Sequence, residues 1–94
     1  MSNSVVIKNI KQLAHNDLVI CLTYNKNGSL LASSDKDKMI FIWETESYKI
    51  LKKLDNHTLP VMLIVFSPFD LLASTSTHGK IIIYNSDYTL RQEI

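Results

Sequence analysis

The chain has 94 residues, the size of one small domain. Hydrophobic residues make up 46% of it and charged residues 20%, which is typical of folded globular proteins and excludes a disordered chain. Ten Lys and Arg against nine Asp and Glu leave a formal charge of +1. This balance does not favour nucleic acid or an anionic membrane as a partner.

Cys21 is the only cysteine, which excludes an internal disulfide framework and fits a reducing compartment. The start of the chain lacks the basic residues and apolar core of a signal peptide. The longest apolar stretch, residues 61–66, is much shorter than the roughly 18–20 residues that span a bilayer. We therefore expect no membrane segment and a location inside the cell, in the cytoplasm or the nucleus.

Taken in chain order, short apolar segments separated by polar turns predict β-strands. The segments are rich in Val, Ile, Leu, Tyr and Phe, and Gly, Asn, Asp, Ser and Pro bound them. They cover residues 7–13, 19–24, 30–34, 39–43, 48–54, 61–66, 71–75, 80–84 and 88–94. A buried helix over residues 19–24 is the alternative, but the β-branched content and the regular turn spacing disfavour it.

The segments form an internal repeat. His15 and His57 lie 42 residues apart, and each is followed by an apolar strand, a polar turn and a Leu-Leu-Ala-Ser sequence. The second turn is one residue shorter, so the offset becomes 41 after it. The lengths differ only in turns, as expected if the segments between them are structural. A period near 40 with four short strands predicts the blade of a β-propeller.

The same residues resemble the WD40 repeat family. The family pattern runs from a His before the first strand to a Trp-Asp pair that ends the third. In this chain the pattern appears as His15, Val19, residues 30–34, Asp37 and residues 40–44. The resemblance covers essentially the whole chain, and it implies an all-β fold made of WD40-like β-propeller blades.

The period divides residues 1–94 into an incomplete propeller of two four-stranded antiparallel blades. Residues 5–13 would be the outer strand of a neighbouring blade, residues 15–54 blade one and residues 57–94 blade two. Closed propellers typically have about four to eight blades, so two blades cannot close a ring. Three possibilities stay open: a piece of a larger propeller, a ring of several copies such as three, or the completion of another polypeptide's propeller.

The resemblance also implies a buried hydrogen-bonded set of a His, a Ser or Thr, an Asp and a Trp in each blade. In the first repeat these residues are His15, Ser33, Asp37 and Trp43. The indole N–H of a buried Trp needs an acceptor, and an imidazole can bridge a hydroxyl and a carboxylate. We interpret these four residues as structural.

The second repeat departs from this pattern. Tyr84 replaces the Trp and His78 occupies the position of the Asp, so that only His57 and Ser74 remain. We interpret His57, Ser74 and Tyr84 as structural as well. The second blade should therefore be less stable than the first or depend more on its neighbours.

No motif in the sequence indicates catalysis. The three histidines with Asp37 could be imagined as metal ligands, but no close pair such as His-x-x-x-His or Cys-x-x-Cys occurs. Cys21 lies within an apolar strand and is expected to be a small buried hydrophobe. A Gly-rich phosphate loop, a Gly-x-Ser-x-Gly motif and paired carboxylates are all absent from the sequence. We expect no enzyme activity, no cofactor and no metal.

The resemblance implies a scaffold for protein partners or peptides, and neither nucleic acid nor membrane is expected to bind. Partners would most often meet the face with the loop before the first strand and the turn between the second and third strands. The candidate partner-binding residues on this face are Leu18, Ile20, Lys36, Pro60, Met62 and Thr77. Alternatively, the apolar members pack into neighbouring blades. The competing function is a purely structural, self-assembling subunit with no separate ligand.

Overall fold

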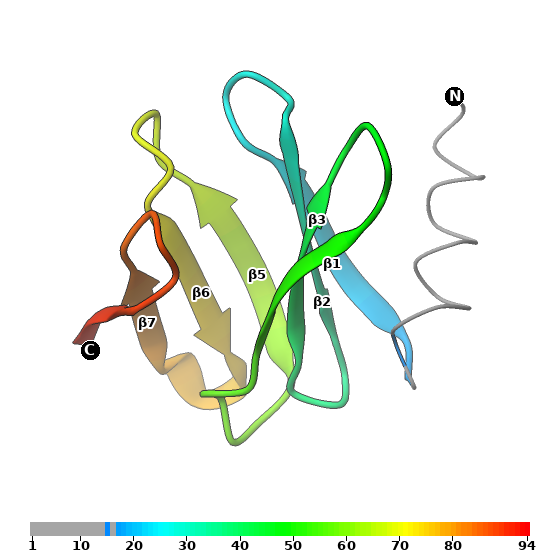
Figure 1. The fold of residues 1–94 in the computed structure, drawn as a ribbon. Helices are drawn as coiled ribbons and strands as arrows, with labels where there is room; N and C mark the ends of the chain where they lie inside the picture. Colours follow the sequence, from blue (N-terminus) through cyan, green and yellow to red (C-terminus); the bar gives the residue numbers. More distant parts are fainter. Residues whose placement is uncertain (1–14, 16) are drawn as a thin grey trace.

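The computed structural model describes residue 15 and residues 17–94. Over this range it has two four-stranded antiparallel sheets in which consecutive strands pair (Figure 1). The first sheet contains β1 (Val19–Tyr24), β2 (Leu30–Asp35), β3 (Ile40–Glu44) and β4 (Ile50–Leu54). The second sheet contains β5 (Val61–Phe66), β6 (Leu72–Ser76), β7 (Ile81–Tyr84) and β8 (Leu90–Glu93), with a short 3-10 turn, η1 (Thr77–Gly79), between β6 and β7.

The predicted fold class is confirmed, because the described residues form two four-stranded antiparallel sheets of consecutive strands. The strand predicted within residues 5–13 lies outside the described residues. Among the described residues, no helix is long and apolar enough to cross a membrane.

Side-chain hydrogen bonds shape the turn that joins the first two strands of each sheet. In the first sheet the Asn25 side-chain oxygen accepts the Leu30 N–H at 2.9 Å. In the second sheet the Ser67 hydroxyl oxygen accepts the Leu71 N–H at 3.0 Å. The Asn25 amide also donates to the Asp70 carboxylate at 3.3 Å, which links the two turns. Polar turn residues thus fix the sheets internally and relative to each other.

One face of the first sheet packs against the second sheet, and we call it the packed face. It consists of Cys21, Thr23, Ala32, Ser34, Ile40 and Ile42, which the strand register places in two adjacent rows. Ala32, Ile40 and Ile42 share one buried cluster with residues of the second sheet, namely Val61, Ile64, Leu72, Ile82 and Tyr84. The main core of the described residues therefore lies between the two sheets.

The opposite face of the first sheet carries a second cluster, made of Leu31, Phe41 and Trp43. These side chains are at most 5% exposed. The first sheet thus buries apolar side chains on both of its faces, as the nearly continuous apolar sequence of β3 requires.

The second sheet differs, because one of its faces is open to solvent. This open face consists of Leu63, Val65, Ala73, Thr75, Ile81 and Ile83, also in two adjacent rows. Leu63 is 51% exposed and Val65 is 48% exposed, and the other four residues are partly buried.

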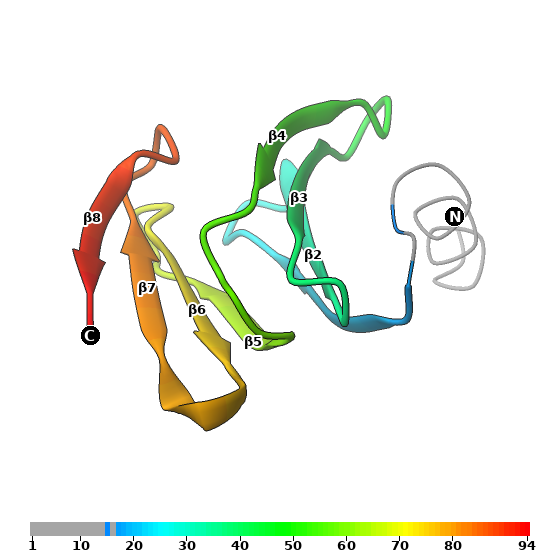
Figure 2. The same cartoon turned by 90° about the horizontal axis from the view of Figure 1, so that it is seen from below.

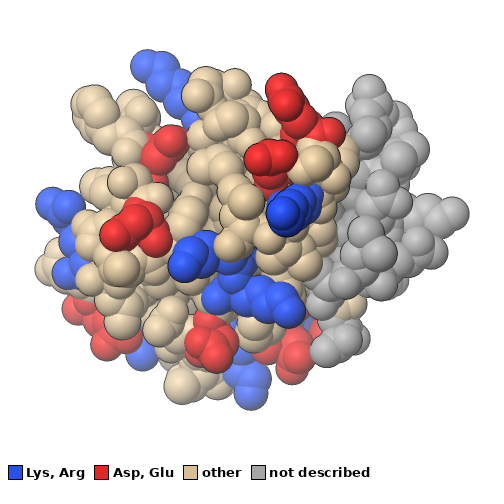
Figure 3. Space-filling view, in the orientation of Figure 1, with Lys and Arg blue, Asp and Glu red and all other residues tan. Residues whose placement is uncertain are grey.

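The two sheets approach each other at their first strands, since β5 lies against β1 and β2. Seen from below, the outer strands β4 and β8 lie farther apart than β1 and β5 do (Figure 2). Lys and Arg are interspersed with Asp and Glu on the face shown in Figure 3, without a continuous field of one sign. The arrangement is that of two neighbouring sectors of a disc, with β1 and β5 innermost.

Because one sheet face is covered and its counterpart is open, the same substitution should lower the free energy of unfolding by different amounts at two matched positions. Ile42 is fully buried between the sheets, and Ile83 is the equivalent residue on the open face. Ile42→Ala should lower the free energy of unfolding by about 2–5 kcal/mol, because it leaves a cavity. Ile83→Ala should cost much less. Urea unfolding of both variants measures the difference, and equal losses would contradict the packing described.

Candidate functional site

Four buried side chains of the first sheet and the segment before it form a hydrogen-bonded network. The Trp43 indole N–H donates to the Ser33 hydroxyl oxygen at 2.9 Å, and Ser33 Oγ lies 2.6 Å from His15 Nε2. His15 Nδ1 bonds the carboxylate of Asp35. Each polar side chain of this network has a hydrogen-bond partner, as buried polar groups require. The structural interpretation of His15, Ser33 and Trp43 agrees with these contacts.

The carboxylate in this network is that of Asp35, so the interpretation of Asp37 as the acidic member is wrong. Asp37 lies exposed in the turn between β2 and β3. Asp35 is 1% exposed and also accepts the Met39 N–H at 3.0 Å, which ties that turn to His15. Strand alternation is the signal that could have identified it, since residues 33 and 35 lie on the same side of a strand.

The second sheet has only part of this hydrogen-bonded network. His57 Nε2 lies 2.6 Å from Ser74 Oγ, and the Tyr84 hydroxyl donates to the Asn56 side-chain oxygen at 3.0 Å. The register equates Ser76 with Asp35, because Val61 pairs with Ser76 as Val19 pairs with Asp35. Ser76, and not His78, therefore occupies the position of the acid.

His57 consequently has a buried nitrogen without a partner. Its Nδ1 atom makes no hydrogen bond, while the Ser76 hydroxyl donates to the Thr77 carbonyl oxygen at 3.2 Å. Burial lowers the pKa of His57 below its ordinary value of 6.5; nearby Lys80 lowers it further and Glu93 opposes the shift. The second sheet thus holds a neutral histidine whose Nδ1 atom lacks the carboxylate partner that Asp35 provides to His15 in the first sheet.

Four of the six candidate partner-binding residues lie at one end of the sheets, where β1 and β5 begin. The Lys36 N–H donates to the Leu18 carbonyl oxygen at 3.0 Å, and the Thr77 N–H donates to the Pro60 carbonyl oxygen at 3.1 Å. Equivalent backbone bonds therefore hold the same pair of segments together in each repeat. This end faces the viewer in Figure 2.

The other two candidates, Ile20 and Met62, occupy irregularities of the inner strands. The β1–β2 register shifts between Val19 and Cys21, and the β5–β6 register shifts between Val61 and Leu63. Ile20 and Met62 are the residues skipped in these β-bulges, which commonly redirect a side chain. Met62 is 46% exposed, and Leu18 beside the first bulge is 56% exposed. We call the six residues together the loop-end surface.

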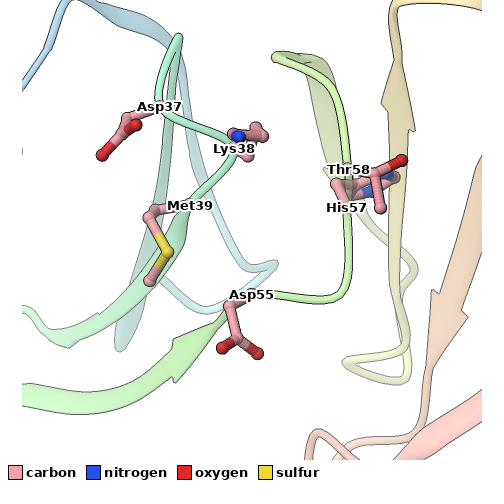
Figure 4. A pocket seen from close by; sticks show the side chains of 6 residues that line it. All are labelled: Asp37, Lys38, Met39, Asp55, His57 and Thr58. Atoms are coloured by element: carbon pink, nitrogen blue, oxygen red, sulfur yellow. The ribbon is translucent and has the colours of Figure 1, made fainter.

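A hollow of about 420 Å³ opens between the two sheets near this end. Asp37, Lys38 and Met39 line it from the β2–β3 turn, and Asp55, His57 and Thr58 line it from the segment that joins β4 to β5 (Figure 4). Both signs of charge meet there, so the hollow suits a mixed polar contact with a partner. Sequence reasoning did not identify it, because its walls come from segments that are apart in the chain.

The described residues show no arrangement for metal binding. No group of three or more His, Cys, Asp or Glu side chains among them could hold a metal ion. His15 and His57 each bond a serine of their own sheet instead.

Comparison with known proteins matches residues 7–44 to the family described as WD domain, G-beta repeat. WD repeat-containing protein C4F8.11 of Schizosaccharomyces pombe is 48% identical, over 85% of this chain and 10% of that protein. COMPASS component SWD3 of Saccharomyces cerevisiae is 32% identical, over 80% of this chain and 24% of that protein. The crystal structure of RRP9 WD40 repeats has a TM-score of 0.82 at 26% identity, over 92% of this chain and 27% of that chain. The chain therefore spans about a quarter of these proteins or less.

The unpartnered His57 nitrogen predicts that Ser76→Asp stabilises the second sheet. The new carboxylate can accept a hydrogen bond from His57 Nδ1, which should add about 1 kcal/mol to the free energy of unfolding near neutral pH. In the unaltered chain the unfolded state binds the His57 proton at a higher pH than the folded state does. Stability should therefore fall as the pH drops below about 6.5, and Ser76→Asp should reduce that loss.

Asp35→Ser is the matched control, because it creates in the first sheet the situation found in the second. It should cost about 1–3 kcal/mol, since it removes the acceptor of His15 Nδ1. Denaturant unfolding between pH 5 and pH 8, at roughly half-unit steps around the ordinary histidine pKa, measures all three chains. A Ser76→Asp chain that is no more stable and equally sensitive to acid would show that position 76 does not serve His57.

Proposed function

Because this chain belongs to the WD40 repeat family, we propose that it is a non-catalytic scaffold that holds protein partners or peptides at its loop-end surface. The observation that carries the proposal is the repeated β-bulge. Both inner strands have a bulge at the same position of the repeat, and the apolar residues Leu18 and Met62 are about half exposed there. Large apolar side chains at a rigid, bulged strand end are suited to contact with another protein.

The rigidity of this surface supports the same function. Backbone hydrogen bonds fix Lys36 to Leu18 and Thr77 to Pro60, so a partner would meet a preformed surface. Preformed surfaces lose little conformational entropy when they bind. Met62 adds a flexible side chain that can adapt to the shape of the partner.

The names of two relatives suit a role in binding other proteins. SWD3 is named as a component of COMPASS, and a relative in Arabidopsis thaliana is named as a transcriptional corepressor. We propose protein partners for this chain as well, and a location in the cytoplasm or the nucleus. We further propose that its two blades, residues 15–54 and 57–94, contribute to a larger propeller.

A photo-crosslinking residue tests the surface directly. Placed at Met62 in the complete protein inside cells, it should form crosslinks to another protein, because that side chain faces the partner. The same residue at Leu90, which is 49% exposed on β8, is the matched control and should form few or none. Equal crosslinking at both positions, or none at position 62, would contradict the proposed surface.

The combined substitution Leu18→Asp with Met62→Asp should lower the yield of those crosslinked partners in affinity capture at least about tenfold, which corresponds to roughly 1.4 kcal/mol. The thermal midpoint should change little, because both side chains are already exposed. Unfolding of this variant would instead place the two residues in the core. Leu90→Asp serves as the control for added charge.

A further inference from the structure

Phe69 is the most exposed large hydrophobic side chain among the described residues. It lies at the tip of the β5–β6 turn and is 84% exposed, whereas the next such side chain, that of Ile94, is 64% exposed. The β5–β6 turn projects beyond the strand ends at the top left of Figure 1. Burial in the core therefore gives no reason for a phenylalanine at this position.

The β5–β6 turn has the same backbone form as the β1–β2 turn. The Gly28 N–H donates to the Asn25 carbonyl oxygen at 3.1 Å, and the Asp70 N–H donates to the Ser67 carbonyl oxygen at 3.1 Å. Gly28 and Asp70 also share a positive φ, of 75° and 62° respectively. The residue before Gly28 and the residue before Asp70 therefore occupy equivalent places in the two turns.

These equivalent residues, Asn27 and Phe69, differ in what they contribute to their turns. The Asn27 side-chain oxygen accepts the Ser29 N–H at 3.0 Å and the Ser29 hydroxyl at 2.6 Å. Asparagine is one of the residues that turns favour, whereas the phenylalanine side chain has no polar atom to offer. Exceptions to local sequence preferences concentrate at functional sites. A phenylalanine that neither the turn nor the core requires is therefore a candidate for contact with another molecule.

Hydrogen bonds and a proline hold Phe69 in place. Pro68 has a fixed φ, because its ring closes on the backbone nitrogen. The Ser67 hydroxyl oxygen accepts the Phe69 N–H at 3.2 Å and the Leu71 N–H at 3.0 Å. An aromatic side chain with few rotatable bonds on a fixed backbone loses little conformational entropy when it binds.

Asp70 places a carboxylate beside the aromatic ring. Its Oδ1 atom accepts the Asn25 side-chain amide at 3.3 Å, and no other residue of the described part of the chain bonds this carboxylate. A basic side chain of a partner can pair with it while the ring enters an apolar pocket. The same negative charge disfavours a membrane surface with anionic lipids, so that these observations favour a protein.

We propose that Phe69 is the anchor of a second interaction surface, at the end of the sheets opposite the loop-end surface. Its partner is a protein with an apolar pocket that takes the phenyl ring and with a Lys or Arg at the rim that pairs with Asp70. β5 begins at the loop-end surface and ends at this turn, so its six residues separate the two surfaces by roughly 20 Å. The chain can thus hold two proteins at once, one at each end of its strands.

A photoreactive phenylalanine analogue tests this surface, because it keeps the aromatic ring. Placed at Phe69 in the complete protein inside cells, it should form crosslinks to another protein. The crosslinked segment of that protein should contain apolar residues and a Lys or Arg. The matched control is the same analogue at Asn27, where few or no crosslinks should form. Equal crosslinking at both positions, or none at position 69, would overturn the inference.

Phe69→Asn gives the second turn the residue of the first. It should raise the Kd for the purified crosslinked protein at least about tenfold, because it removes the anchor. The thermal midpoint should stay the same or rise slightly, because asparagine suits a turn. Asp70→Asn should weaken the same binding less, and its effect should shrink as salt is added. A midpoint lowered by several degrees in Phe69→Asn would assign Phe69 to folding and overturn the inference.

Three further results would each assign Phe69 to a different occupant and overturn the inference. One is crosslinking of the purified protein to a second copy of itself. Another is a crosslink confined to the same polypeptide, and the third is binding to vesicles of phosphatidylcholine and phosphatidylserine that Phe69→Asn abolishes. Crosslinking at Met62 is independent of all these results, so a failure of this inference can be distinguished from a failure of the proposed loop-end surface.

Discussion

The structure depends on one constraint, which is that each four-stranded sheet has apolar side chains on both faces. Covering such a face stabilises a sheet, because apolar burial is the main favourable contribution to folding. The contact between the packed face and the second sheet covers one face of each and forms the main buried cluster. The open face is the side of the second sheet that this contact leaves uncovered.

Buried side-chain hydrogen bonds add to the stability that this packing provides. In the first sheet, a carboxylate, an imidazole, a hydroxyl and an indole satisfy one another and join the turn after β2 to the sheet. In the second sheet the acid is missing and one imidazole nitrogen has no partner. The loop-end surface therefore lies on one sheet in which the histidine has both of its partners and on another in which it has one.

Much of the fold could be predicted from the sequence, because strands and turns leave local signals. Alternation, β-branched residues and the repeat beginning at His15 and His57 identified the strands and their pairing into fours. The acid was placed at Asp37 instead of Asp35, because the two residues are close in the chain and only the strand register separates them. The β-bulges at Ile20 and Met62 and the solvent exposure of the open face could not be predicted, since both depend on how the sheets fit together in space.

The most direct test of this account measures solvent access to matched isoleucine methyl groups. A soluble paramagnetic probe is added to the methyl-labelled protein, and signal loss is compared for Ile40 and Ile42 of the packed face and Ile81 and Ile83 of the open face. The methyl signals of the partly buried Ile81 and Ile83 should broaden more than those of Ile40 and Ile42, which are 0% exposed. Equal broadening of all four would show that the two sheets do not pack as described, and equal protection would show that the second sheet has no open face.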